Sequence, residues 1–347
     1  MKSAKVIALV ISLFLLMMLS VSPAMAKVFK MKFASMDPPG AGDTLTADWW
    51  ASQVEKRTGG RVKIERFWSG SLIGGYEQLH AVKTGVIQLT FLYSGYHPKN
   101  APLTVITLLP CLNVGLPKVS FAATDELMRT NKAIIAELKR NNVKYLFPFT
   151  MTNHYLWSMV PMRTLDDFDG LRLRSWGFNY TLFKKWGCGM VSLPVPEVYD
   201  SLERKAVDAT TMYISNGVSL RLHEVVKYLN VTELGHNLGC PAVINLNTWN
   251  KLPADIQKII EEVNAETVDK CTEIAMESYR KGMAAVKDAG LIIQRFSPEE
   301  EKVLAEVARK EIWETYAKKL DKMGVPGTKT LQHYLELLKK YEKIYKQ

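Results

Sequence analysis

An arginine stands where a short strand ends in the segment Gly170–Gly177, which has the sequence GLRLRSWG. The residue types predict a strand over Leu171–Ser175 that breaks at the second glycine. On an outer strand face, Arg174 would be an ordinary surface charge. At a strand end that faces a cleft, its planar guanidinium would bind an anion, because the fork matches the two oxygens of a carboxylate. The residues alone leave both interpretations open.

Motifs for catalysis are absent from the sequence, which has no G-x-S-x-G, P-loop or H-E-x-x-H pattern. The six histidines are scattered, and none has a zinc-ligand spacing with cysteine. Five acidic residues are interpreted as helix caps or surface charges: Asp37, Asp43, Glu77, Glu197 and Asp208. We therefore expect neither an enzyme nor a metal or cofactor site.

The N-terminus predicts export. Lys2 and Lys5 precede an apolar run over residues 6–21, and Ala24-Met25-Ala26 is a small-x-small cleavage site. Together these features are typical of a secretory signal peptide over residues 1–26, and the apolar run is short for a membrane anchor. No later stretch is long and apolar enough to span a bilayer. We expect a mature chain in the periplasm.

The formal net charge of +10 raises the question of nucleic-acid binding. The basic residues are spread along expected helices and form no dense block, so we expect no nucleic-acid partner. We also expect the chain to be a monomer. The four cysteines lie far apart, at positions 111, 188, 240 and 271. Their spacing is compatible with a disulfide between Cys188 and Cys240 and equally with buried free thiols.

The elements that would position Arg174 alternate between strand and helix. The first part of the chain predicts β-α-β-α-β, with strands over residues 28–35, 61–68 and 87–93 and helices over 44–58 and 75–84. The same order returns over 171–212, which predicts two α/β lobes. A helical stripe over 253–289 is longer than about 50 Å at 1.5 Å per residue, so we expect this helix to bridge the lobes.

Ligands of open α/β sheets bind beyond the carboxyl ends of the strands. The residues expected at such ends, or in the crossover 149–157, are Met36, Tyr76, Tyr93, His154, Arg174, Trp176, Met212 and Tyr213. The set holds one strong cation and one histidine among aromatic and thioether side chains. Only this joint pattern favours a pocket, since each residue alone would be an ordinary core or surface residue.

Several motifs in the expected order resemble the DctP-type extracytoplasmic solute receptors of TRAP transporters. They are GLRLR over 170–174, PVPEVY over 194–199, AVD over 206–208, the glycine-rich turn and helix start over 69–79, and WNKLP over 249–253. The resemblance covers nearly all of the mature chain. It implies two α/β lobes joined by a hinge and a long bridging helix, and a site that closes over one small solute for delivery to a permease of small and large membrane subunits.

The resemblance also implies that Arg174 forms a salt bridge with the carboxylate of the solute. It implies lobe I over 27–151 plus about 240–278, and lobe II over 152–239 plus about 279–347. Residues that sialic-acid receptors use for polar contacts differ here. The differing positions are Met36, Tyr76, Tyr93, His154 and Met212, and Trp176 replaces a proline that follows the arginine motif. His154 stands where those receptors carry a second arginine, and Met212 stands for an asparagine.

These departures predict an aromatic or branched apolar monocarboxylate, or a 2-keto acid, as the solute. A ring or branched tail would pack on the aromatic walls, whereas a second charged or polar end would face apolar groups. His154 would donate to a keto or carboxyl oxygen. The alternatives are a C4-dicarboxylate or sugar acid as solute, or a ligand-sensing subunit of a signalling system.

Overall fold

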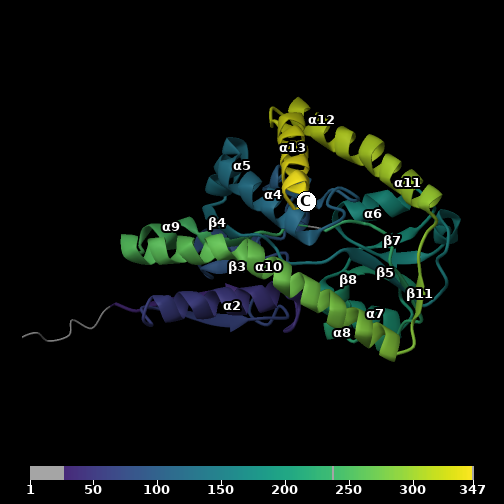
Figure 1. Cartoon of the computed structure of the whole chain (residues 1–347), viewed down its shortest axis with the longest axis horizontal. Helices are drawn as coiled ribbons and strands as arrows, with labels where there is room; N and C mark the ends of the chain where they lie inside the picture. The colour runs from purple at the N-terminus through teal and green to yellow at the C-terminus, as the bar shows by residue number, and fades with distance from the viewer. Residues whose placement is uncertain (1–26, 237, 346–347) are drawn as a thin grey trace, which may run out of the picture.

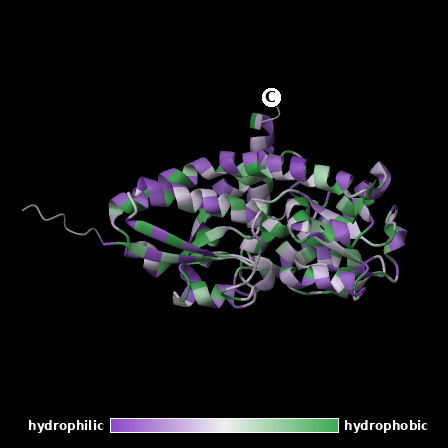
Figure 2. Ribbon diagram, turned by 90° about the horizontal axis from the view of Figure 1, so that it is seen from below, coloured by the Kyte–Doolittle hydropathy of each residue, from purple (hydrophilic) through white to green (hydrophobic). Residues whose placement is uncertain are grey.

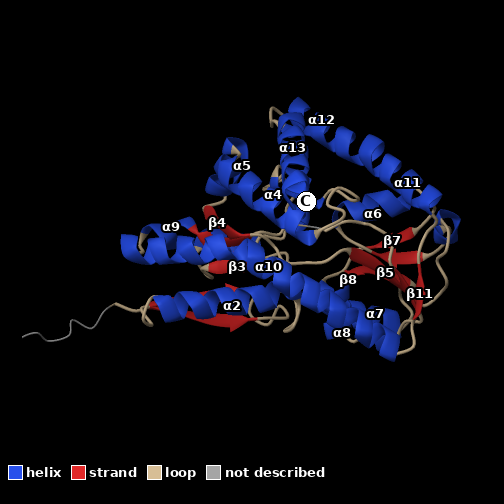
Figure 3. Ribbon diagram, viewed as in Figure 1, coloured by secondary structure: helices blue, strands red, loops and turns tan. Residues whose placement is uncertain are grey.

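The structure is a computed structural model that describes residues 27–236 and 238–345. Two separate sheets lie beside each other, each covered by helices (Figures 1 and 3). The predicted α/β class with two lobes and a long bridging helix is confirmed. The predicted signal peptide, residues 1–26, lies outside the described residues.

Lobe I is built on a five-stranded sheet with the order β2-β1-β3-β10-β4. Its strands are β1 (Phe29–Ala34), β2 (Val62–Phe67), β3 (Leu89–Phe91), β4 (Val143–Phe147) and β10 (Ala242–Asn245). Its helical segments are α2 (Gly42–Arg57), α3 (Gln78–Thr84), η1 (Ser94–Tyr96), η2 (Thr104–Leu108), α4 (Pro117–Thr130), α5 (Lys132–Arg140) and α9 (Leu246–Asn250). β1 runs parallel to both neighbours, whereas β10 runs antiparallel to β3 and β4.

Lobe II is built on a six-stranded sheet with the order β11-β9-β5-β8-β6-β7. Its strands are β5 (His154–Ser158), β6 (Arg172–Arg174), β7 (Gly189–Val191), β8 (Ala209–Tyr213), β9 (Tyr228–Asn230) and β11 (Ile292–Gln294). Its helical segments are η3 (Leu165–Phe168), α6 (Gly177–Lys184), η4 (Val195–Glu197), α7 (Val198–Glu203), α8 (Ile214–Ser219) and η5 (Leu222–Glu224). β6 runs parallel to β7 and β8, so their carboxyl ends meet at one edge.

The predicted β-α-β-α-β order of the first lobe is confirmed, although the elements are shorter than expected. The strand expected over 87–93 spans only Leu89–Phe91, because η1 begins at Ser94 and turns the chain. Gly85 ends α3 with a positive φ of 83°, a conformation that glycine adopts without strain. The same order in lobe II places β6, α6, β7, α7 and β8 close to the expected positions.

The long helix α10 (Ala254–Asp288) crosses from one lobe to the other (Figure 1). It packs on α2 and α4 of lobe I and on α8 of lobe II. Its contact with lobe I includes a hydrogen bond of 2.7 Å from Trp50 Nε1 to Asn264 Oδ1. A Cβ at Gly282 would lie 2.6 Å from Ile214, so this glycine permits the close approach of α8.

The C-terminal strap is the run of helices α11 (Pro298–Val307), the π-helix η6 (Ala308–Trp313), α12 (Glu314–Lys322) and α13 (Gly327–Tyr345). In Figure 1 the strap leaves lobe II beside β11 and returns over the top of the molecule to α4. Tyr334 ends up buried in lobe I, with its hydroxyl 2.7 Å from Thr124 Oγ1 and 2.6 Å from Asn113 Oδ1. We keep the predicted lobe boundaries as a proposal and amend them by assigning α13 to lobe I.

All four cysteines are buried and free, so the alternative of a disulfide between Cys188 and Cys240 is wrong for this structure.

Hydrophobic and hydrophilic residues alternate along the helices in Figure 2, as expected for helices with one buried face. Among the described residues, no helix combines the length and the apolar character that crossing a membrane requires.

Candidate binding site between the lobes

Arg174, the last residue of β6, has a fully buried side chain. Its guanidinium donates hydrogen bonds to two backbone carbonyls, from Nη2 to Leu193 O at 2.8 Å and from Nη1 to Thr211 O at 3.5 Å. None of the ion pairs found within 27–236 and 238–345 includes Arg174. Burial lowers the pKa of Arg174, yet a guanidinium remains charged at neutral pH. A buried cation held only by neutral acceptors is costly, and an anionic ligand would relieve that cost.

Aromatic rings from both lobes surround the end of β6. Tyr96 of lobe I lies 5.7 Å from the ring of Trp176 in lobe II and 4.7 Å from the ring of Tyr76. A Cβ at Gly95 would lie 2.6 Å from the indole of Trp176, so the indole packs directly on the backbone of η1. The two lobes are therefore in contact here, and the site is closed.

His154, the first residue of β5, is buried between Trp176 and Tyr213, whose ring centroid lies 4.0 Å away. Its Nδ1 lies 3.0 Å from Asn179 Nδ2. Because an amide nitrogen only donates, Nδ1 accepts and Nε2 carries the ring proton. Burial, and secondarily the charge of Arg174, lower the pKa of His154 to about 3. The imidazole is neutral at physiological pH.

Tyr96 carries a buried hydroxyl for which no hydrogen-bond partner is found among the described residues. Burial raises the pKa of this phenol, and the nearby charge of Arg174 opposes the rise. A buried hydroxyl without a partner is destabilising. An oxygen of a bound solute near Arg174 would satisfy it.

Asp37 and Asp43 are both buried, which overturns their interpretation as surface charges. Asp43 does lie in the first turn of α2, as a cap would. Asp37 accepts hydrogen bonds from Tyr93 at 2.8 Å and from Asn216 of lobe II at 2.6 Å. Ser35 donates to Asp43 at 3.2 Å. These carboxyls form a buried polar cluster at the closed boundary between the lobes.

The structure brings six of the eight predicted residues into one connected set by ring contacts or by proximity to Arg174: Tyr76, Tyr93, His154, Arg174, Trp176 and Tyr213. Tyr76 keeps 48% of its surface exposed and lies at the rim. Met36 packs on Gly75, and Met212 lies beside Tyr155 in the strand register, so both have packing roles. Solute contact by any of the eight stays a prediction.

Sequence reasoning missed four residues of the site: Gly95, Tyr96, Asn179 and Asn216. Tyr96 had a signal, because the segment YSGY puts it three residues after Tyr93 and beyond the end of β3. The sequence gives no signal for Asn216, since its partner Asp37 lies 179 residues earlier in the chain.

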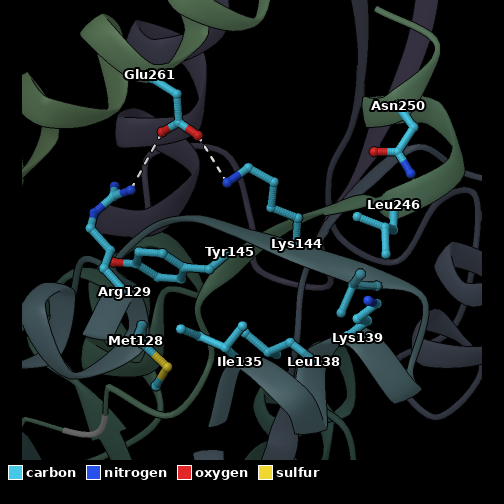
Figure 4. A pocket seen from close by; sticks show the side chains of 11 residues that line it. Met128, Arg129, Ile135, Leu138, Lys139, Lys144, Tyr145, Leu246, Asn250 and Glu261 are labelled. Carbon is cyan, nitrogen blue, oxygen red and sulfur yellow. Dashed lines mark hydrogen bonds and ion pairs between the residues drawn. The ribbon is translucent and has the colours of Figure 1, made fainter. Parts of the chain in front are cut away.

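Two cavities at the surface illustrate the surroundings of the site. A cavity of about 550 Å³ on lobe I, between α5, β4 and α10, is lined by Arg129, Lys144 and Glu261 among others (Figure 4). Three of its charged side chains are paired, because Glu261 accepts from Arg129 at 3.4 Å and from Lys144 at 2.9 Å. A cavity of about 350 Å³ opens beside Trp176, between Gly95 and Phe178.

Comparison with known proteins gives one family over most of the chain. The model of the family described as DctP, bacterial extracellular solute-binding protein, family 7, matches residues 33–319. The C4-dicarboxylate-binding periplasmic protein DctP of Rhodobacter capsulatus is 26% identical, over 77% of this chain and 80% of that protein. A monocarboxylate 2-oxoacid-binding periplasmic protein of Nostoc is also 26% identical, over 66% of this chain and 63% of its own length.

A solved structure with the same fold is that of a TRAP periplasmic solute-binding protein from Desulfovibrio salexigens with bound orotic acid. It is 21% identical and has a TM-score of 0.80, with 90% of this chain and 99% of that chain covered. This likeness supports the two-lobed architecture.

Proposed function

Because the chain belongs to the bacterial extracellular solute-binding protein family 7, we propose that it captures a small organic carboxylate between its lobes and delivers it to a membrane permease. Proteins of this family are solute receptors and not enzymes. The observation that carries the proposal is the fully buried guanidinium of Arg174, whose hydrogen bonds among the described residues go to backbone carbonyls and whose side chain forms no ion pair there. A solute carboxylate would supply the missing charge.

The solute class follows from the groups around Arg174. The Nε2–H of His154 and the hydroxyl of Tyr96 would donate to the carboxylate or to a neighbouring keto oxygen, and Trp176 and Tyr213 would cover an apolar tail. We therefore favour an aromatic or branched monocarboxylate or a 2-keto acid. The Nostoc relative and the orotate-bound structure are named for such acids, which supports this class. A C4-dicarboxylate is the second candidate, because the Rhodobacter relative is named for it.

Closure would work by population shift. A solute that touches Arg174 in lobe II and Tyr96 in lobe I makes both contacts only when the lobes are together, so it favours the closed form. The closed surface would then be recognised by the small and large permease subunits. In this proposal the leader over residues 1–26 carries the chain to the periplasm, where it acts as a monomer.

A thermal-shift panel on residues 27–347 tests the solute class. Benzoate and 4-methyl-2-oxopentanoate are compared with succinate, a sugar acid and the neutral analogue benzamide. At a hundred times its Kd, a true solute adds about 2.7 kcal/mol of stability, which raises Tm by about 4 °C for a chain of this size. A rise with succinate or the sugar acid alone would exclude the aromatic or branched class.

Tyr96→Phe is expected to weaken carboxylate binding about ten- to a hundredfold, because it removes a donor to a charged group. The ligand-free protein should be as stable as the wild type, since the lost hydroxyl has no partner among the described residues. Tyr316→Phe is the control, because its hydroxyl donates to Pro102 O at 3.0 Å and its loss should cost stability without changing Kd. Calorimetry and urea unfolding measure both effects, and an unchanged Kd for Tyr96→Phe would remove this hydroxyl from the site.

A further inference from the structure

The acidic pair Asp37 and Asp43 holds an unusual arrangement of hydrogen bonds. Their carboxyls share one hydrogen-bond network, because Ser35 donates to Asp43, Tyr93 donates to Asp37, and the hydroxyls of Ser35 and Tyr93 lie 2.8 Å apart. Asp43 Oδ1 is buried, and no donor to it is found among the described residues. Two buried carboxylates cannot both be ionised at contact distance, whereas a proton on Asp43 directed at Asp37 would satisfy both groups.

The environment of the pair depends on lobe closure. Asp37 follows β1 and Asp43 lies in α2, so both belong to lobe I. Asn216 belongs to α8 of lobe II, and its amide donates to Asp37 Oδ1 at 2.6 Å. When the lobes separate, Asp37 loses this partner and gains water. Closure therefore brings two opposed effects to Asp37: burial, which disfavours its charge and is the larger, and the Asn216 amide, which favours it.

The charged and titratable groups that influence Asp37 come from several elements: Asp43 of α2, Tyr93 after β3, Tyr96 of η1, Arg174 of β6, Tyr213 of β8 and Cys240 before β10. Burial raises the pKa of Asp37 to about 6, although hydrogen bonds from Tyr93, Asp43 and Asn216 and the charge of Arg174 lower it in part. Burial also raises the pKa of Asp43 well above its usual range. The phenols and the thiol have raised pKa values, so they stay neutral.

Arg174 is the one cation in that set, and it favours an ionised Asp37. A solute carboxylate bound to Arg174 would neutralise that effect and add a negative charge nearby. Both changes favour a proton on Asp37. Binding and closure therefore act on the pair in the same direction.

We propose that closure of the lobes over a carboxylate takes up one proton from solvent at the Asp37–Asp43 pair, so that the solute is bound more weakly as the pH rises. The proposal rests on the proposed function. The sign follows from linkage: the closed form holds more protons than the open form, so low pH favours closure. This advantage is lost as the pH rises through about 6.

Calorimetric titration of residues 27–347 with benzoate and with 4-methyl-2-oxopentanoate, at pH 5, 6, 7 and 8, tests the proposal. If Asp37 titrates near 4 in the open form and near 6 in the closed form, Kd rises about tenfold between pH 5 and pH 7. Titrations in buffers with different ionisation enthalpies should show an uptake approaching one proton at pH 5. His154, with a pKa of about 3, does not titrate in this window.

Asp37→Asn keeps the shape of the side chain and removes its titration, so its Kd should be nearly constant from pH 5 to pH 8. Asp48→Asn is the matched control, because Asp48 lies on α2 but pairs with Arg66 at 3.3 Å, and it should keep the wild-type slope. An equal Kd at pH 5 and pH 7 in the wild type would overturn the proposal. So would a tenfold change that persists in Asp37→Asn.

Small-angle scattering of the ligand-free protein separates this proposal from the proposed function. The wild type should be compact at pH 5 and more expanded at pH 8, and Asp37→Asn should show no such change. If neither probe binds at any pH while this difference appears, the solute class is wrong and the proton linkage of closure stands. If the radius of gyration is the same at both pH values and neither probe binds, the linkage is wrong as well.

Discussion

Arg174→Met is expected to abolish carboxylate binding and to leave the ligand-free protein at least as stable as the wild type. The variant leaves a solute carboxylate buried without its partner, which costs about 3–5 kcal/mol, or more than a hundredfold in Kd. Without solute, the same change replaces a buried cation, held by the carbonyls of Leu193 and Thr211, with an apolar chain of similar length. Such replacements are neutral or stabilising in many proteins.

The control for Arg174 is Arg172, two residues earlier on the same strand. Its guanidinium is half exposed and pairs with Asp208 at 2.7 Å. Arg172→Met should change stability little and leave Kd unchanged, because exposed ion pairs contribute little to stability. Calorimetry and thermal unfolding of both variants measure the contrast. A large loss of ligand-free stability in Arg174→Met would show that the guanidinium supports the strand ends, and wild-type affinity would show that it binds no carboxylate.

Trp50→Ala is expected to cost about 3–5 kcal/mol in the free energy of unfolding. Trp50 is fully buried between the sheet of lobe I and α10, and its ring lies 5.3 Å from that of Phe147. The change leaves a cavity and also removes the hydrogen bond to Asn264. That loss is a large share of the total stability of an ordinary protein, about 5–15 kcal/mol. Urea unfolding followed by circular dichroism measures it.

The neighbouring tryptophan provides the control. Trp49 precedes Trp50 on α2 and is only partly buried, beside Leu45 and Val218. Trp49→Ala should cost less than half as much as Trp50→Ala, and Trp50→Phe should cost about 1–3 kcal/mol for the lost hydrogen bond and volume. Equal losses for the two alanine variants would mean that burial against α10 is not the source of the effect.

The long helix was the element most accessible to sequence reasoning. Its stripe of apolar residues repeats over many turns, and Pro253 and Gly290 mark its two ends, so the predicted bounds 253–289 differ from the observed helix by one residue at each end. The buried face also holds three polar residues that the predicted stripe did not include, Asn264, Thr267 and Ser278. Asn264 is explained only by the tertiary contact with Trp50.

The sequence predicts those residues of the site that lie at the ends of strands. Arg174 and Tyr213 end β6 and β8, and His154 begins β5, which runs antiparallel to β8, so one sheet edge brings them together. The contacts of Asp37 and Asn216 join two lobes, and no local pattern encodes such a pair. The docking of α13 on α4 is likewise non-local, which is why the strap was assigned to lobe II.

The strap gives the molecule a second mechanical tie. Lobe I, α10, lobe II and the strap form a closed linkage, because Trp313 of the strap donates to Pro110 O of lobe I at 2.8 Å and Tyr316 lies 4.8 Å from Phe178 of lobe II. The chain also crosses between the lobes after β4 and after β9. A wide separation of the lobes must therefore release one of the two contacts of the strap as well as those around Arg174.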